Sequence, residues 1–305
     1  MSLTANLSYI SRGSFHDGTG VRTVVYFKGC GLRCLWCHNP ETFAKSADVF
    51  YAPNKCISCG RCIGICPDCH KISGGKHVYD REKCTQCGRC AEVCPSGALA
   101  LCGERKTVEE VFSIVKKDSH YYEASGGGVT LSGGECLLQA EFCAALLKKC
   151  RTENIGTAIE TALFCPYDNV EKVLPYTDLI YADLKLADGE KHRRYTGKGN
   201  EVILQNLLRV SQKAKCLIVR IPVIPTVNDG EEDMTAFGEI VKGLGDRLAG
   251  VELLKYNYLA ASKYQSLGKE YPSFADRAQT REEMQRLCTL LQKEIGSKCE
   301  VFFRS

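Results

Sequence analysis

The chain has 305 residues with 20 cysteines, and its 40 basic and 36 acidic side chains give a formal net charge of +4. Its composition, 44% hydrophobic and 25% charged, is typical of a globular protein and excludes the disordered and fibrous classes. Because it has no long basic tract and no apolar run of membrane-spanning length, we expect it to bind neither nucleic acid nor a membrane. Residues 1–12 contain no continuous apolar stretch, so we expect no secretory signal and a cytoplasmic location. A chain of this length needs no disulfide scaffold, and so many reduced thiols indicate metal binding.

The first predicted element is a strand over residues 21–27, which are rich in β-branched and aromatic side chains. A C-x3-C-x2-C loop follows this strand and contains Cys30, Cys34 and Cys37. Three thiolates leave one iron of a cubane cluster without a protein ligand, and an open coordination position is typical of a site that performs chemistry. The alternative is a zinc site that His38 completes.

Residues 46–105 contain two groups of four cysteines, each with the C-x2-C-x2-C-x3-C-P spacing of bacterial ferredoxins. The first group is Cys56, Cys59, Cys62 and Cys66, and the second is Cys84, Cys87, Cys90 and Cys94. Because the last cysteine of such a group ligates the neighbouring cluster, we pair the first three of each group with the last of the other. Zinc knuckles are the alternative, and Cys69 and Cys102 lie close enough in sequence to compete as ligands.

Beyond residue 105, predicted helices and strands alternate. A helix begins at Thr107, where Thr107 and Glu110 form a capping box. Strands are predicted near residues 129–131, 155–160, 178–183, 217–223, 250–255 and 299–303, and helices near 138–152, 167–174, 201–214, 231–243 and 280–294. This alternation predicts an α/β fold with a parallel sheet, which places ligands at the carboxyl ends of its strands. The cysteine loop, the glycines after residue 131 and the segment 183–185 all lie at such ends.

Three motifs together identify a resemblance. The cysteine loop continues as HNPET, and the chain also contains SGGE at 132–135 and ADLK at 182–185. In these residues the chain resembles the radical S-adenosylmethionine (SAM) superfamily and, within it, the glycyl-radical-enzyme activating enzymes of the longer type with a two-cluster insert. The resemblance implies a radical SAM partial (β/α)6 barrel formed by residues 1–45 and 106–305. It also implies a ferredoxin-like insert with two [4Fe–4S] clusters at 46–105.

The resemblance also implies a set of binding residues. Cys30, Cys34 and Cys37 would hold a [4Fe–4S] cluster whose open iron takes SAM. The residues expected to contact SAM are Trp36, Cys37, His38, Gly133, Gly134, Glu135, Glu160, Asp183, Leu184, Lys185 and Asn257. Two alternatives stay open, since Gly-Gly-Glu also forms ordinary turns and an acid two residues from a lysine also forms a solvated strand end. Asn257 stands where the family has histidine, so this position cannot titrate near neutral pH.

The implied activity is reductive cleavage of SAM, followed by removal of a hydrogen atom from one glycine of a partner glycyl radical enzyme. It uses three [4Fe–4S] clusters, one that binds SAM and two auxiliary clusters. We expect a monomer that receives electrons from flavodoxin or ferredoxin and needs no side chain as general base. Two other function classes stay open, a ferredoxin-type electron-transfer protein and a radical SAM enzyme acting on a small molecule or peptide. The insert could also be a structural or docking module, and most of the other cysteines are expected in the core.

Overall fold

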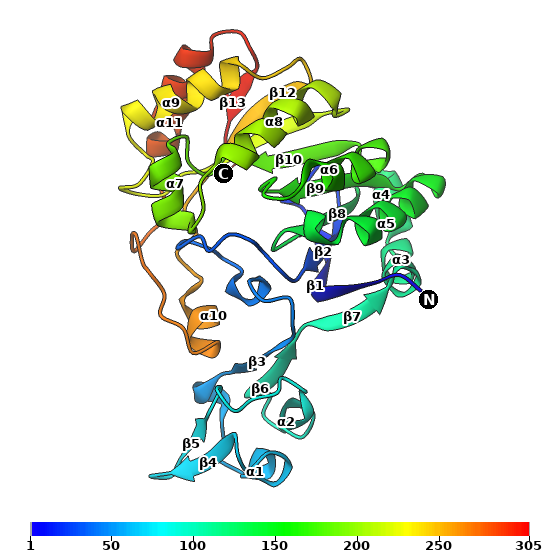
Figure 1. Cartoon of the computed structure of the whole chain (residues 1–305), viewed down its shortest axis with the longest axis vertical. Coiled ribbons are helices and arrows are strands. Elements are labelled where there is room, and N and C mark those ends of the chain that lie inside the picture. Colours follow the sequence, from blue (N-terminus) through cyan, green and yellow to red (C-terminus); the bar gives the residue numbers. More distant parts are fainter. Residues whose placement is uncertain (1, 305) are drawn as a thin grey trace.

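The computed structural model describes residues 2–304 and has two parts, a large α/β body and a small projecting insert (Figure 1). The body is built on a nine-stranded sheet in the order β13-β12-β11-β10-β9-β8-β2-β1-β7. Its strands are β1 Thr4–Ser14, β2 Arg22–Phe27, β7 Glu104–Thr107, β8 Gly128–Gly133, β9 Gly156–Thr161, β10 Leu179–Asp183, β11 Leu217–Pro222, β12 Leu248–Leu254 and β13 Glu300–Phe302. All neighbours from β2 to β13 are parallel, which confirms the predicted parallel sheet, whereas β1 is antiparallel to both β2 and β7.

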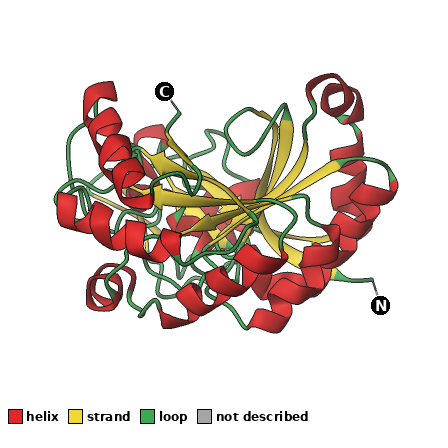
Figure 2. Ribbon diagram, turned by 90° about the horizontal axis from the view of Figure 1, so that it is seen from above, coloured by secondary structure: helices red, strands yellow, loops and turns green. Residues whose placement is uncertain are grey.

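The helices of the body lie along the outside of the twisted sheet, except the short helix at 261–266, which lies beside the insert (Figure 1 and Figure 2). They are α3 Val108–Lys116, α4 Ser119–Ser125, α5 Ala140–Thr152, α6 Tyr167–Val173, α7 Gly189–Thr196, α8 Glu201–Lys213, α9 Glu231–Lys242, α10 Ala261–Ser266 and α11 Arg281–Ile295. The predicted capping box at Thr107 is present, with reciprocal bonds between Thr107 and Glu110. Among residues 2–304, no helix combines the length and the apolar character needed to cross a membrane.

Five body elements were not predicted from the sequence, namely β1, β7, α4, α7 and α10. The antiparallel strand β1 was not expected, because its Ser, Arg and Gly residues weaken the strand pattern, and its pairing with β2 contains two irregularities. The short helices α7 and α10 were also not expected. With eight and six residues they carry too few turns for a clear apolar periodicity, so only their packing distinguishes them from loops.

The insert contains two small antiparallel sheets and two short helices. Its elements are β3 Asp48–Tyr51, α1 Arg61–Ile65, β4 His70–Ser73, β5 Lys76–Tyr79, α2 Arg89–Glu92 and β6 Leu99–Cys102. Strand β3 pairs with β6, and β4 pairs with β5. Strand β7 directly follows the insert and pairs with β1, so residues 104–107 lie in the main sheet.

Two apolar clusters position the site. The larger one fills the space between the sheet and its helices. A smaller one packs the cysteine loop, through Leu32, Cys34 and Trp36, against residues from the carboxyl-terminal half of the body, such as Ile224 and Tyr256. The loop after β2 is therefore part of the folded core and not a mobile surface segment.

Candidate active site

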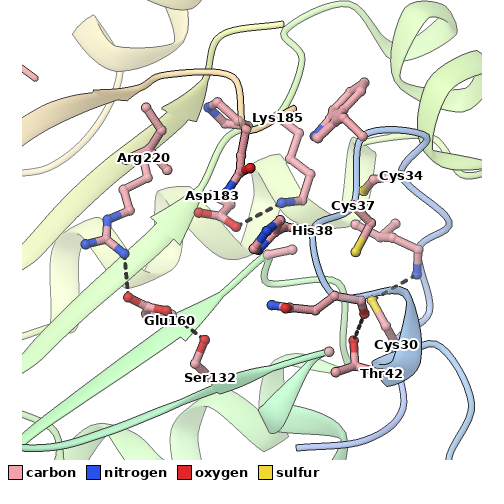
Figure 3. A pocket seen from close by; sticks show the side chains of 18 of the residues that line it. Cys30, Cys34, Cys37, His38, Thr42, Ser132, Glu160, Asp183, Lys185 and Arg220 are labelled. Atoms are coloured by element: carbon pink, nitrogen blue, oxygen red, sulfur yellow. Dashed lines mark hydrogen bonds and ion pairs between the residues drawn. The ribbon is translucent and has the colours of Figure 1, made fainter. Parts of the chain in front are cut away.

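The three-cysteine loop lines a cavity of about 310 Å³ at the carboxyl ends of the parallel strands (Figure 3). Cys30, Cys34 and Cys37 lie on one side of it, and the charged side chains of Glu160, Asp183, Lys185 and Arg220 lie on the other. Of the expected SAM contacts, the cavity lining includes Trp36, Cys37, His38, Gly133, Gly134, Glu160, Asp183, Lys185 and Asn257. The topology thus brings together motifs that are more than 200 residues apart in sequence.

The donor set in this cavity fits a cluster with an open iron. Burial raises the pKa of Cys30 to about 11 and that of Cys37 to about 12. Bare thiolates are therefore unfavourable here, whereas iron both deprotonates a bound thiol and neutralises its charge. The residues described supply three thiols to this cavity, one fewer than a fully protein-ligated cubane needs.

Gly133 and Gly134 are required by backbone packing. Gly133 has a φ of +112°, and a Cβ there would lie 2.2 Å from the Phe27 nitrogen, while one on Gly134 would lie 2.4 Å from the Gly29 oxygen. The close approach lets Gly134 N–H donate to the Phe27 carbonyl at 2.9 Å and Glu135 N–H donate to the Gly29 carbonyl at 2.8 Å. The two glycines therefore hold the end of β8 against the start of the cysteine loop, in addition to lining the cavity.

Glu135 and Leu184 lie behind the cavity wall. The Glu135 carboxylate is buried and accepts hydrogen bonds from the Thr161 hydroxyl at 2.8 Å, Ala162 N–H at 3.0 Å and Leu137 N–H at 3.2 Å. Burial raises its pKa to about 7. Leu184 is part of the main apolar core. Neither side chain lines the cavity. Glu135 instead connects the end of β8 to the end of β9 through its hydrogen bonds, and contact of either residue with SAM stays a prediction.

A chain of buried ion pairs forms the charged side of the cavity. Glu160 accepts a hydrogen bond from the Ser132 hydroxyl at 2.6 Å and pairs with Arg220, which in turn bonds Glu252 at 2.7 Å. Burial raises the pKa of Glu160, and the Arg220 charge opposes that rise. Beside this chain, Lys185 Nζ lies 2.8 Å from Asp183 Oδ2. These groups are suited to bind a zwitterion that carries both carboxylate and ammonium groups.

Arg220 and Tyr256 line the cavity but were missed at the sequence level. A signal for Arg220 was present, since it is the one charged residue of the strand Leu-Ile-Val-Arg-Ile-Pro, and a buried charge in a strand implies a partner. Tyr256 has no comparable signal. Its hydroxyl lies 2.8 Å from that of Tyr271, which is a contact that only the folded loop creates.

Trp36, His38 and Asn257 also line the cavity. Trp36 is 8% exposed and packs against the rings of Tyr195 and Phe274, with centroid distances of 6.2 and 6.1 Å. Burial, with a smaller effect of Lys263, lowers the pKa of His38, so this ring is neutral at pH 7. The Asn257 side-chain oxygen accepts Leu259 N–H at 3.0 Å, which leaves its amide N–H groups as donors.

The segment FHDGTG, residues 15–20, precedes β2 and therefore lies at the opposite end of that strand from the cysteine loop. Backbone carbonyls of the segment accept hydrogen bonds from body side chains, Asp17 O from the Thr130 hydroxyl at 2.7 Å and His16 O from Arg220 at 3.3 Å. The segment is thus held by side chains of the strands β8 and β11.

In the insert, the structure brings the first three cysteines of one group to the last of the other. One small cavity is lined by Cys56, Cys59, Cys62 and Cys94, as in the predicted pairing. In the other set, Cys69 N–H donates to the Cys66 carbonyl at 3.2 Å, and burial, with smaller effects of Cys66 and Cys84, raises the pKa of Cys69 to about 12. Cys69 therefore stays a competitor for a ligand position. Cys102 lies beside Lys28, Glu41 and Asp48, at the junction of insert and body.

The seven other cysteines divide by burial. Cys136, Cys143, Cys150, Cys165 and Cys288 are buried, and Cys216 and Cys299 are half-buried. Cys143 Sγ donates to the Cys136 carbonyl at 3.2 Å. All of them except Cys216 belong to the main apolar cluster or pack against it, which is the role expected of most of these cysteines.

Comparison with known proteins places this geometry in a family. A "4Fe-4S binding domain" description matches residues 77–100, which include the second four-cysteine group. The chain is 44% identical over 269 residues to the (2S)-3-sulfopropanediol dehydratase activating enzyme of Klebsiella oxytoca, covering 86% of this chain and 85% of that one. It is 40% identical to the choline trimethylamine-lyase activating enzyme of Oleidesulfovibrio alaskensis, covering 93% of this chain and 94% of that one. The chain belongs to the glycyl-radical-enzyme activating enzymes of the radical SAM superfamily.

The fold agrees with this assignment. Streptococcus suis SuiB bound to precursor peptide SuiA superposes with a TM-score of 0.54 at 14% identity, covering 92% of this chain and 48% of that one. As an activating enzyme, this oxidoreductase uses SAM and iron–sulfur chemistry to activate a partner glycyl radical enzyme. Because the identity extends over the body as well as the insert, the alternative of a ferredoxin-type electron-transfer protein is not supported.

Proposed function

We propose that SAM binds in the cavity between the cysteine loop and the strand ends. The proposal is supported by one observation, the set of three thiols that faces paired charged side chains across this cavity. A [4Fe–4S] cluster held by Cys30, Cys34 and Cys37 would supply one electron for the cleavage of SAM. Asp183 and Lys185 would orient the bound SAM from one side and Glu160 from another. The packed rings of Trp36 and Phe274 would exclude water from the reacting atoms.

We further propose the architecture that accompanies this activity. Residues 1–45 and 106–305 correspond to a partial (β/α)6 barrel, and residues 46–105, of which the last two already belong to β7, correspond to an insert with two auxiliary [4Fe–4S] clusters. In this arrangement the enzyme would act as a cytoplasmic monomer, with flavodoxin or ferredoxin as electron donor. The partner would be a glycyl radical enzyme of the kind its relatives are named for, such as a dehydratase or a lyase of a small polar compound.

Iron content and SAM cleavage test the proposal together. Anaerobic reconstitution of the full chain should give about twelve irons per protein, and the Cys34→Ala variant should lose about four of them. Cys34→Ala should abolish SAM cleavage, whereas Cys87→Ala should retain cleavage with a strong chemical reductant. Cys216→Ala is the matched control and should retain both iron and activity. Eight irons or fewer in the wild type would mean that at least one of the three proposed clusters is absent. Equal loss of cleavage in Cys34→Ala and Cys87→Ala would contradict the separate roles of the SAM-binding and auxiliary clusters.

A further inference from the structure

Two buried histidines lie beside one of the predicted cluster ligands in the insert. His70 on β4 and His77 on β5 occupy diagonal cross-strand positions, since His77 pairs with Ile72 and His70 pairs with Tyr79. His77 Nε2 lies 3.3 Å from Cys62 Sγ and 3.1 Å from His70 Nδ1. The two imidazoles are 2% and 8% exposed, so water competes little for these contacts.

The number of hydrogens that each group can carry determines which group is the donor in the contact between His77 and Cys62. A cysteine that ligates iron is a thiolate, which can only accept a hydrogen bond. The proton between the two groups must therefore be on His77 Nε2, and His70 Nδ1, 3.1 Å from the same nitrogen, must carry a lone pair. The other ring nitrogen of His77, Nδ1, is buried without a partner among the residues described. A lone pair at that position is less costly than an orphaned N–H, which independently favours the tautomer with the proton on Nε2.

Aromatic packing holds the His77 ring in place. The Tyr51 ring packs edge-on against it at a centroid distance of 4.8 Å. His70 stacks on it at 5.1 Å and is itself stacked on Tyr79 at 4.8 Å. His77 also lines the small cavity formed by Cys56, Cys59, Cys62 and Cys94. The ring is thus fixed between aromatic neighbours, with its donor nitrogen directed at the ligand set.

We propose that His77 donates a hydrogen bond to the Cys62 sulfur and thereby raises the reduction potential of the auxiliary cluster that Cys62 helps to hold, with His70 as the residue that positions His77. Hydrogen bonds to cluster sulfurs stabilise the added negative charge of the reduced cluster, so losing one lowers the potential. The inference rests on the proposed function, because it requires that these four cysteines bind a [4Fe–4S] cluster. His77 would set how readily that cluster accepts an electron.

Redox titration of the reconstituted full chain, followed by electron paramagnetic resonance, tests the inference. The signal that disappears in Cys62→Ala belongs to this cluster. His77→Leu should lower the ratio of reduced to oxidised cluster at a fixed potential about tenfold, which is about 59 mV for a one-electron couple. His77→Gln places an amide N–H near the same point and should retain most of the wild-type ratio. His120→Leu replaces an exposed histidine of α4 and should change nothing.

The iron content of the variants and the SAM-cleavage activity distinguish a failure of this inference from a failure of the proposed function. An unchanged potential in His77→Leu, or an equal shift in His77→Leu and His77→Gln, would overturn the hydrogen bond. Loss of iron in both His77 variants would show that His77 is itself a ligand and would also overturn the inference. SAM cleavage with a strong chemical reductant should be the same in all His77 variants. Absence of that cleavage in the wild type would contradict the proposed function while leaving the potentials measurable.

Discussion

At the residue scale, the active-site cavity is a place where every buried charge has a partner. Arg220 bridges Glu160 and Glu252, and Glu252 also bonds Arg304 at 3.0 Å. The Arg220 guanidinium also lies 3.6 Å from the centroid of the Tyr181 ring. The alternation of positive and negative side chains in this series of ion pairs reduces the free-energy cost of burying each charge, and it keeps Glu160 fixed at the cavity wall.

Arg220→Met is expected to lower the free energy of unfolding by about 3–5 kcal/mol, because it leaves the buried Glu160 carboxylate without a cation and removes one of the two cations beside Glu252. The measurement is anaerobic chemical denaturation followed by circular dichroism. Arg247→Met changes an exposed arginine and should cost less than about 0.5 kcal/mol. A loss in Arg220→Met no larger than in that control would show that the ion-pair chain contributes little.

Asp118 links three elements through one side chain. Its carboxylate accepts from Arg12 Nε at 2.9 Å and from the Thr23 hydroxyl at 2.7 Å, and Arg12, followed by Thr23, holds its pKa below the usual 3.8. Asp118→Asn should therefore cost about 1–3 kcal/mol of unfolding free energy at neutral pH.

The sign of the Asp118 shift also predicts a pH dependence. A carboxylate with a depressed folded-state pKa contributes stability above its unfolded pKa and loses it as the pH falls through the folded value. The difference between wild type and Asp118→Asn should thus be constant between pH 6 and 8, as measured by denaturation at several pH values. A difference that varies across this range would mean that another group titrates with it.

At the scale of elements, the short helix α10 is attached to the cysteine loop. Lys263 Nζ lies 2.9 Å from Glu41 Oε1 and 2.8 Å from Asn39 Oδ1, both in the segment directly after Cys37. Glu41 is 2% exposed. A helix too short to be stable alone is therefore held in part by this ion pair, and the pair in turn fixes the segment that follows the cluster ligands.

Lys263→Met should cost about 1–3 kcal/mol of unfolding free energy and make the SAM-binding cluster more labile, because Glu41 loses its cation. The double variant Lys263→Met/Glu41→Gln should recover part of the stability, since a neutral amide needs no counter-charge. Lys242→Met breaks an exposed pair with Glu294 at 3.6 Å and should cost about 0–1 kcal/mol. Rates of iron loss in air, measured beside denaturation, check the effect on the cluster. A double variant less stable than Lys263→Met would contradict this explanation.

At the scale of the whole molecule, the insert leaves and re-enters the body at one place. Asp48 and Cys102 are partners in the β3–β6 pair, so the two connecting chains run side by side. The buried Lys28 of the body contacts both, at 3.4 Å from Asp48 Oδ2 and 3.4 Å from the Cys102 carbonyl. Arg81 adds a second attachment, because it bonds the Val49 and Ser266 carbonyls.

Replacing residues 48–102 with a linker of about four residues should leave a body that folds, because paired strands end about 5 Å apart. The product should hold about four irons and cleave SAM with a strong chemical reductant, but reduction by flavodoxin should be at least about tenfold slower. Iron analysis and 5′-deoxyadenosine assays measure these outcomes. If the shortened protein fails to fold, the full-length Cys59→Ala/Cys87→Ala variant provides the same comparison. A folded product that cannot cleave SAM would show that the insert is part of the active site.

Several features of the fold and the site could be read from local sequence. The strand before Cys30, the capped helix at Thr107 and the regular alternation after residue 128 were all predicted, because each depends on neighbours within a few residues. Glu135 was expected to contact SAM, which stays a prediction, and its side chain lies behind the cavity wall. Its orientation depends on donors from Thr161 and Ala162, more than 25 residues away, and no local pattern contains them.

The cysteine spacings by themselves determined the chemistry of this protein, because ligand spacing within a tight loop is a local property of the chain. They separated one incomplete set of thiols from two complete ones. Only the tertiary structure decided which groups face that incomplete set. Parallel strands carry Glu160, Asp183 and Arg220 to one end of the sheet, and the buried ion pairs fix their directions. Those contacts join residues far apart in sequence, and a buried charge takes its partner from whatever the fold places beside it.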